Sequence, residues 1–346
     1  FNNVYIFIIL RSFIGIGEAS YGTIVPPLID NLSDEKSKSL ILSIYFLAMP
    51  LGFALGFVIS GFLQQYMDWH YLFLLEGCIV LFLSFFLLCF KKKIEEYRKP
   101  KIFEELDQPL TNVVEDYESL EKIKINEMSI GHKLCNVIMN KLFMVLLFGY
   151  AGYNFLIGSF SYWGPGYLID NYNYTSSNAS YVFGGITVGA GILGSASGGF
   201  LLDYLKNKYG NNDERRELKL GNYVILGNII LSYICCNIIF LINNIIVFFV
   251  FFFIAEFCLF ALVGPINSML LWSMEKSRYT DKLNSEIKVI GCALSICIIH
   301  LLGDVPSPIL TGYIYDRTGS WNTSFLVITQ FLLVSIISWT VTIFIK

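Results

Sequence analysis

The sequence is poor in charged residues and in histidine. Only 15% of its 346 residues are Asp, Glu, Lys or Arg, whereas a soluble domain carries about 25%. It contains only three histidines. Hydrophobic residues make up 55% of the chain, and the mean hydropathy is +0.60. This composition excludes an ordinary soluble domain and indicates a membrane protein.

Several functional signatures are also missing. A G-x-x-x-x-G-K-[ST] phosphate loop does not occur, which excludes a P-loop ATP-driven pump. The eight cysteines show no C-x-x-C spacing and lie mostly in apolar runs, so we expect no metal site and no cofactor. No cleavable signal peptide is expected, because Arg11 lies within the first apolar run and not ahead of it. The chain opens at Phe1 without a methionine, so we expect its natural start to lie further upstream.

Nine apolar runs are long enough, or nearly so, to cross a bilayer, which takes about 20 residues. Their boundaries are set by the charged and turn-forming residues between them. The sequence therefore predicts an all-α polytopic membrane protein. The runs cover residues 4–29, 41–63, 70–90, 142–168, 180–205, 219–241, 245–272, 287–315 and 323–345.

The basic residues predict how these runs are oriented. If Phe1 lies on the outer side, all 24 Lys and Arg residues except Arg11 and Arg317 fall in cytoplasmic segments or the adjoining helix ends. This is the positive-inside pattern of membrane proteins. The charged segment 91–141 cannot span the membrane. We expect it to be a cytoplasmic linker between a helical bundle in 1–90 and a six-helix bundle in 142–346.

A faint internal repeat supports this division into halves. Gly61 and Trp69 flank the end of the second run, and Gly312 and Trp321 flank the end of the eighth. In each case Trp opens the next helix after a short outer loop. Weak repetition of two helical halves is typical of secondary transporters.

Two charges interrupt the first run. Arg11 and Glu18 are seven residues apart, so about two helical turns place them on one face. A charge at mid-membrane costs about 2.5–3.5 kcal/mol, so both should face protein or a water-lined cavity. They can therefore form a structural ion pair between helices or line a transport pathway, and the second hypothesis is the sharper one.

A second polar group occurs in the eighth run. His300 and Asp304 are one turn apart and can hydrogen-bond or share a proton. Pro306 and Pro308 follow, and they interrupt the helix and free carbonyl groups that a cavity or a neighbouring helix must satisfy. The pair is either a satisfied core contact or part of a substrate or proton site.

Further candidates are single residues. Glu256 lies deep in the run 245–272 and either faces the cavity or packs between helices. On the run 142–168 we expect three polar or aromatic residues to line a cavity and contact a headgroup. These candidates are Asn154, Tyr162 and Trp163.

Two motifs resemble a known family. The pattern R-x-x-x-G-x-G-E-A-S-Y, which starts at Arg11, is similar to the fourth membrane helix of Spinster-type transporters, a lipid-transporting branch of the major facilitator superfamily. The pattern H-L-L-G-D-x-x-S-P-x-L-x-G-x-x-x-D, which starts at His300, also resembles these proteins. Residues 42–56 and 158–165 extend the likeness to the fifth and seventh helices. Gly199 to Asp203 resembles the superfamily's conformational loop motif, although its usual following Arg is absent.

The resemblance implies a major facilitator-type two-bundle fold with nine of twelve helices present. It also implies a secondary, proton-coupled transporter of a lysophospholipid or sphingoid lipid, in a lysosomal, vacuolar or plasma membrane. Arg11, Glu18, His300, Asp304 and Glu256 would then serve substrate binding or proton coupling. An acidic residue on the family's first helix would pair with Arg11, and that residue is not in this sequence.

Other functions stay open at this point. Arg11 would serve a small organic anion as well as a lipid phosphate, and a receptor or scaffold descended from a transporter is a further alternative. A membrane enzyme using His300 and Asp304 would need more catalytic groups at the same membrane face. Because the sequence offers no second cluster, we expect a transporter and not an enzyme.

Overall fold

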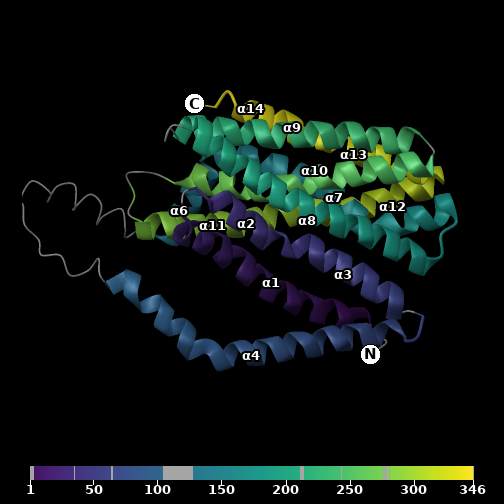
Figure 1. Ribbon diagram of the computed structural model, residues 1–346, viewed down its shortest axis with the longest axis horizontal. Coiled ribbons are helices and arrows are strands. Elements are labelled where there is room, and N and C mark those ends of the chain that lie inside the picture. The colour runs from purple at the N-terminus through teal and green to yellow at the C-terminus, as the bar shows by residue number, and fades with distance from the viewer. Residues whose placement is uncertain are drawn as a thin grey trace, which may run out of the picture.

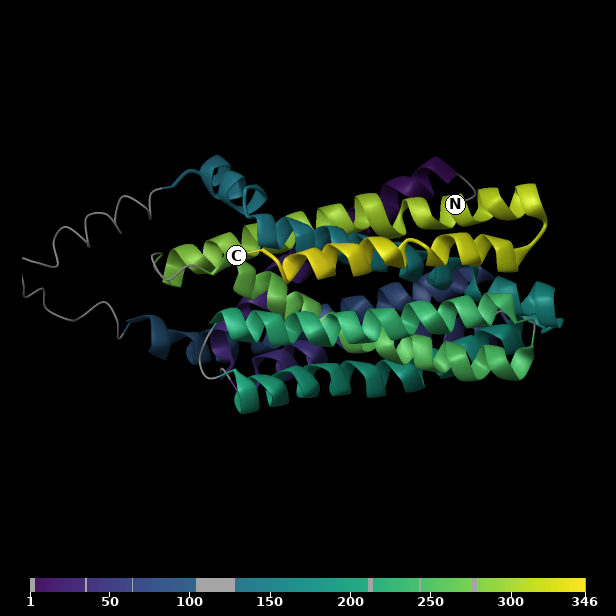
Figure 2. The same ribbon diagram turned by 90° about the horizontal axis from the view of Figure 1, so that it is seen from above.

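A computed structural model describes residues 4–34, 36–63, 65–103, 128–210, 214–242, 244–275, 279 and 281–345. All regular elements within these residues are helices, and most run along the long axis of the molecule (Figure 1; Figure 2). The helices are α1 (Val4–Leu32), α2 (Lys38–Phe46), α3 (Ala48–Leu63), α4 (Trp69–Phe103), α6 (Ile130–Ile138), α7 (Lys141–Tyr172), α8 (Ser176–Tyr209), α9 (Glu214–Leu241), α10 (Ile245–Met274), α11 (Asp281–Ile299), η1 (His300–Asp304), α12 (Pro306–Thr318), α13 (Trp321–Thr329) and α14 (Leu332–Thr342).

Each of the nine predicted runs forms one helix or a consecutive set of helices. Within the described residues, eight stretches are long and apolar enough to cross a membrane, and a shorter apolar stretch covers His70–Phe86 of α4. The predicted all-helical membrane fold is therefore confirmed. The division into 1–90, 91–141 and 142–346 stays a prediction. The helix α4 continues beyond residue 90, and the acidic residues 104–127 of the expected linker lie outside the described part of the chain.

Prolines explain two of the helix breaks. Pro50 lacks an N–H and its ring would clash with the carbonyl of residue 46, where α2 ends. In the eighth run, Pro306 and Pro308 remove two further backbone donors. The chain there forms the π-turn η1, in which the Val305 N–H donates to the His300 carbonyl at 3.2 Å. Turns of this kind frequently mark functional sites.

The core lies in the region from α7 to α14. Trp339 is fully buried and donates its indole N–H to the Leu146 carbonyl, while Ser335 donates to the Gly149 carbonyl. Glycine at 149 leaves the space that the Trp339 ring fills. The helices α1 to α4 lie along one flank of this core (Figure 1).

Helices α2 and α3 join the core through α8. Ser43 lies against Gly199, and Pro50 lies against Gly191. The two contacts are seven residues apart along α2–α3, and eight residues apart in the reverse direction along α8. The two segments therefore pack antiparallel. This close approach places Phe53 of α3 beside α8 and α10.

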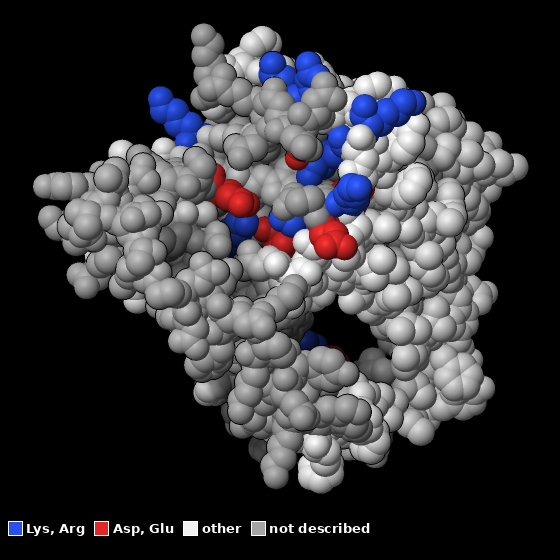
Figure 3. Space-filling view, turned by 60° about the vertical axis from the view of Figure 1, so that its left-hand side comes forward, with Lys and Arg blue, Asp and Glu red and all other residues white. Residues whose placement is uncertain are grey.

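Charged side chains gather at one end of the molecule (Figure 3). We call the end where α1 finishes and α11 begins the charged end. It carries Asp30, Lys133, Lys206 and Lys288, and α6 is joined to α11 there by an ion pair between Lys133 and Glu286. The other end is called the opposite end.

The close contact between α8 and α10 predicts a stability effect. A Cβ atom at Gly198 would overlap the backbone carbonyl of Ala261, which cannot move aside without shifting α10. We expect Gly198→Ala to lower the free energy of unfolding by about 1–3 kcal/mol. Gly185→Ala on the same helix is the matched control, because a Cβ atom there meets nothing within 4 Å. Thermal unfolding in detergent should separate the two variants, and equal melting temperatures would contradict the tight contact.

Candidate functional site

The candidate site is built on the antiparallel contact between α1 and α11. At the charged end, Asp30 bonds to Lys288. Eight residues back along α1, Gly22 lies against Ile296, and a Cβ atom there would be 2.9 Å from the isoleucine Cδ1. One more turn brings Glu18 to the level of His300, and its carboxylate lies within electrostatic range of the imidazole.

His300 and Asp304 form the pair that their spacing predicts. The imidazole Nδ1 lies 2.8 Å from Asp304 Oδ2 and 3.0 Å from Oδ1. Both residues belong to η1, and their side chains are 48% and 31% exposed. The Ser307 hydroxyl donates to the Asp304 carbonyl at 3.4 Å, and Pro308 cannot supply the helical N–H that this carbonyl would otherwise accept. The site therefore combines a titratable pair with a backbone held in a non-α conformation.

Helix α7 supports this turn from behind. Asn154 is half-buried against Gly303 and donates its amide to the Tyr150 carbonyl at 2.9 Å. The Trp163 indole N–H donates to the Pro308 carbonyl at 2.9 Å. Tyr162 is 67% exposed. Its ring forms a T-shaped contact with that of Trp163. Asn154 and Trp163 thus contact the segment from η1 to α12, whereas Tyr162 is largely exposed.

Arg11 and Glu18 contact different neighbours. The Arg11 guanidinium lies 4.6 Å from the ring centroid of Phe73 on α4 and 5.6 Å from that of Phe7. The described residues include no ion pair between Arg11 and Glu18. Both charged side chains are exposed. A guanidinium stacked on aromatic rings keeps its in-plane N–H donors available for a ligand.

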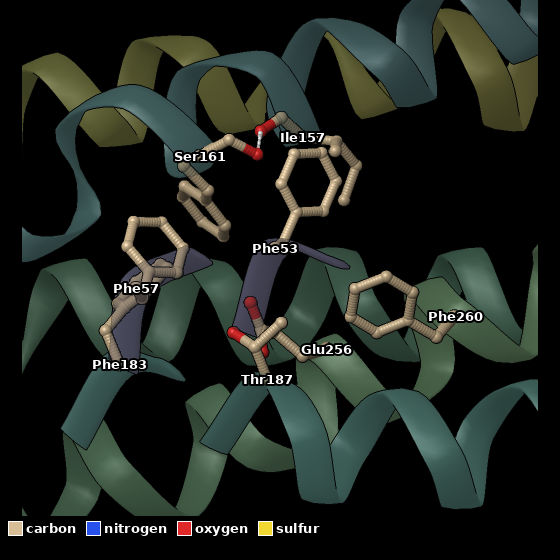
Figure 4. A pocket seen from close by; sticks show the side chains of 9 residues that line it. Phe53, Phe57, Ile157, Ser161, Phe183, Thr187, Glu256 and Phe260 are labelled. Atoms are coloured by element: carbon tan, nitrogen blue, oxygen red, sulfur yellow. Dashed lines mark hydrogen bonds between the residues drawn. The ribbon is translucent and has the colours of Figure 1, made fainter. Parts of the chain in front are cut away.

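Glu256 lies in a separate small pocket between α3, α7, α8 and α10 (Figure 4). The residue is 4% exposed, and its Oε2 atom has no hydrogen-bond partner among the described residues. Thr187 lies beside it, and the rest of the lining is mainly aromatic. The phenylalanines of the lining are Phe53, Phe57, Phe160, Phe183 and Phe260. A carboxyl group with so few polar neighbours is expensive to keep charged and is suited to carrying a proton.

Two buried tyrosines lie between these sites. Tyr150 and Tyr153 are 5% and 3% exposed, with ring centroids 5.7 Å apart. Tyr150 lies within electrostatic range of Asp304, and Tyr153 within range of Glu256. The Tyr150 hydroxyl also accepts from the Asn267 amide at 3.3 Å. Sequence reasoning missed Tyr150 and Asn267, although Tyr150, Tyr153 and Asn154 have the spacing of one helix face.

The expected conformational motif contacts α2. Asp203 accepts from the backbone N–H of Leu40 at 2.8 Å and of Ser39 at 3.3 Å, at the first turn of that helix. These are N–H groups that the helix leaves unpaired, and a carboxylate there also suits the helix dipole. Gly199 lies one turn earlier, where Ser43 leaves no room for a side chain. The motif therefore fixes the end of α8 to the start of α2.

Comparison with known proteins gives consistent results. The profile of the Major Facilitator Superfamily matches residues 1–280. The chain is 29% identical over 352 residues to the probable sphingolipid transporter spinster homolog 1 of Arabidopsis thaliana, covering 99% of this chain and 67% of that protein. It is 30% identical over 346 residues to homolog 2 of the same plant, covering 98% and 64%. Identity to human protein spinster homolog 1 is 26% over 342 residues, covering 93% and 58%. The chain thus spans about two thirds of the length of its plant relatives.

Proposed function

Because the chain belongs to the Major Facilitator Superfamily, we propose that it is a secondary transporter that moves a lysophospholipid or sphingoid lipid by alternating access. The membership confirms the family expected from the motifs at Arg11 and His300. It also confirms a multi-pass membrane fold, and it favours transport over the membrane-enzyme hypothesis.

The observation that carries the proposal is the group formed by Glu18, His300 and Asp304. Glu18 lies on α1, which packs against α11, and the other two residues lie on η1, which directly follows α11; the histidine bonds directly to Asp304. An imidazole between carboxylates can change its charge near neutral pH. The group can therefore take up or release a proton as the site changes its exposure. Glu256 offers a second carboxyl group for the same purpose, deeper in the molecule.

Support for a lipid substrate comes from two sources. The Arabidopsis relatives are described as probable sphingolipid transporters. The charges of the site also suit such headgroups, because a sphingoid base carries an ammonium and a lysophospholipid carries a phosphate. The Glu18 carboxylate can bind an ammonium, and the planar fork of Arg11 can bind a phosphate in two places.

The same proposal assigns an orientation. The charged end holds Lys133, Lys206 and Lys288, so it faces the cytoplasm by the positive-inside rule. Residues 1–90 and 142–346 would move as two units, with 91–141 as the connection at the cytoplasmic side. The membrane that contains the protein would be lysosomal, vacuolar or plasma membrane.

Uptake into proteoliposomes tests the function directly. The purified protein should accumulate a labelled lysophospholipid or sphingoid base when a pH gradient is imposed, and a proton ionophore should abolish the accumulation. A labelled dicarboxylate serves as the competing substrate class. Uptake of the dicarboxylate alone would replace the proposal with an organic-anion carrier. Binding of the lipid without uptake would favour a receptor.

The pair of His300 and Asp304 predicts that a variant can lose proton-driven uptake and still exchange lipid across the membrane. In Asp304→Asn the imidazole loses its carboxylate partner. We expect gradient-driven uptake to fall by about tenfold or more, while exchange of labelled for unlabelled lipid without a gradient persists. Tenfold corresponds to about 1.4 kcal/mol, within the range for a hydrogen bond to a charged group. Asp68→Asn is the control, because Asp68 is exposed outside the helices. Equal loss of both activities would assign Asp304 to substrate binding.

A further inference from the structure

We propose that the short helix α6 lies in the membrane surface at the charged end and inserts one face among the lipid headgroups. This placement goes beyond the transport function, and it can be tested without a substrate. α6 (Ile130–Ile138) is too short to cross a bilayer, since a helix of this length measures about 14 Å. It packs against α11 and α7 at the charged end (Figure 1).

The polarity of α6 is the reverse of that of a helix on a water-exposed surface. Lys133 is 8% exposed and pairs with Glu286 of α11, and Val137, one turn later, is 1% exposed. Ile130 and Met139 are in contrast 76% and 73% exposed. A surface helix in water normally turns its apolar residues to the core and its lysines outward. The outer face of α6 is therefore suited to surroundings less polar than water.

The exposed apolar residues form one continuous face. Side chains four residues apart lie on the same stripe of a helix, which aligns Ile130, Leu134 and Ile138. Cys135 and Met139 are also exposed and widen this stripe. We call these five residues the apolar arc. At about 100° per residue the arc covers about half of the helix circumference, as in helices that lie in a membrane interface.

The neighbouring chain favours the bilayer as the occupant of the apolar arc. Asn140 caps the membrane-spanning helix α7 by accepting from the Phe143 N–H at 3.2 Å, so α6 ends two residues before a spanning helix begins. The lipid that surrounds α7 is thus continuous with the surroundings of α6. Residues 128–141 include the exposed Lys141 and no Asp or Glu. No negative charge of this segment therefore opposes its approach to anionic headgroups.

Two contacts hold the apolar arc outward. The ion pair of Lys133 with Glu286 joins the opposite side of α6 to α11. Just after α6, the Asn140 amide donates to the Ser273 carbonyl of α10 at 2.7 Å. Rotation of α6 about its axis would break the ion pair and expose Val137, so the face that meets the lipid is fixed in advance. Because α11 leads directly into η1, this arrangement connects the membrane surface to the helix that precedes His300.

The alternative occupant of the apolar arc is protein, either another part of this chain or a separate partner. Both a protein and a bilayer would shield the arc from water, so dehydration alone does not identify the membrane. Contact with acyl chains does, and it can be measured in the full chain.

Quenching by nitroxide-labelled lipids measures this contact. Leu134→Cys, Ile138→Cys and His132→Cys, each in a background without native cysteines, are labelled with the fluorophore NBD and reconstituted into phosphatidylcholine–phosphatidylserine vesicles. We expect the labels at 134 and 138 to emit at shorter wavelength than in water. They should lose most of their emission when the lipids carry a nitroxide on the upper acyl chain, because an interfacial helix inserts by about 5–10 Å.

His132 is the matched control position. It is exposed on the same helix but is turned by about 160° from Leu134, outside the apolar arc. A label there should be quenched far less than the labels at 134 and 138. Equal quenching at all three positions would contradict the proposed face. Because the three residues are exposed, we expect the labelled variants to keep the melting temperature of the unlabelled protein in detergent, and this measurement identifies any variant that fails to fold.

Two results would overturn the proposal. Emission as in water at 134 and 138 would place the apolar arc in the aqueous phase, and shifted emission that nitroxide lipids do not quench would assign it to a protein. Spin labels at the same positions provide a second measurement. Oxygen should relax the labels at 134 and 138 more strongly, and a water-soluble nickel chelate should relax the label at 132 more strongly. The reverse order would refute insertion, whether or not the protein transports lipid.

Discussion

Replacing Arg11 by alanine is expected to abolish transport, and replacing it by lysine to remove most transport while the fold is kept. The guanidinium binds a phosphate through two parallel N–H donors, whereas an ammonium offers a point charge. Hydrogen bonds to charged groups contribute about 1.5–3 kcal/mol. Losing one such bond corresponds to roughly a tenfold to hundredfold decrease in the uptake rate at limiting substrate. The uptake of a labelled lysophospholipid into proteoliposomes measures this effect.

Arg317 provides the matched control for this prediction. Its guanidinium also lies over an aromatic ring, at 5.4 Å from the Tyr313 centroid, but the residue is exposed near the end of α12. We expect Arg317→Ala to transport normally. Surface level and melting temperature must be measured for each variant, because loss of the Phe73 contact could lower stability. An Arg11→Ala protein that is equally abundant and transports at the native rate would remove Arg11 from the site.

Replacing Glu256 is expected to raise stability and abolish proton-coupled transport together. The carboxyl group is enclosed by phenylalanine rings, and one of its oxygens has no partner among the described residues. Replacing a poorly bonded buried polar group by an apolar group of similar shape removes its desolvation cost. Glu256→Leu should therefore raise the free energy of unfolding by about 1–3 kcal/mol. Because leucine carries no proton, uptake driven by a pH gradient should be lost.

Glu256→Gln and Thr187→Val complete this test. Glutamine keeps the shape of the side chain but cannot titrate, so it should lose coupling without the gain in stability. Valine removes only the hydroxyl beside Glu256 and should leave uptake nearly unchanged. If Glu256→Leu instead melts at a lower temperature, the carboxylate has a structural role that its surroundings do not suggest.

Hydrophobic runs predicted the elements because membrane spans need long apolar stretches. All nine runs became helices, and the spacing of His300 and Asp304 predicted their bond. The partners of α1 could not be predicted in this way. Periodicity places Arg11 and Glu18 on one face, but it does not say which helix lies beside each turn of that face. The structure brings Glu18 near His300 and Arg11 onto Phe73, because α1 leaves α11 between them.

Burial of charge was the second feature that sequence could not reveal. Lys288 stands near the charged end of its run, where basic residues are normally exposed. Its enclosure depends on Asp30, 258 residues away in the chain, and on the ends of two other helices. Tyr150 was missed for a related reason. Tyrosine is frequent in this sequence, and only its burial beside Asn267 distinguishes this one from the others.

The π-turn at His300–Asp304 also determines how the following helix, α12, is rotated. A π-turn accommodates one residue more than an α-turn, so every later side chain points about 100° away from where a continuous α-helix would direct it. With this offset Ser307 and Thr311 are fully buried, and Thr311 meets the Ser159 hydroxyl at 2.7 Å. Val305 and Ile309 point outward, at 59% and 72% exposure. Deleting one residue from the turn would rotate the later side chains back by about 100°, so that Ser307 and Thr311 would leave their buried positions.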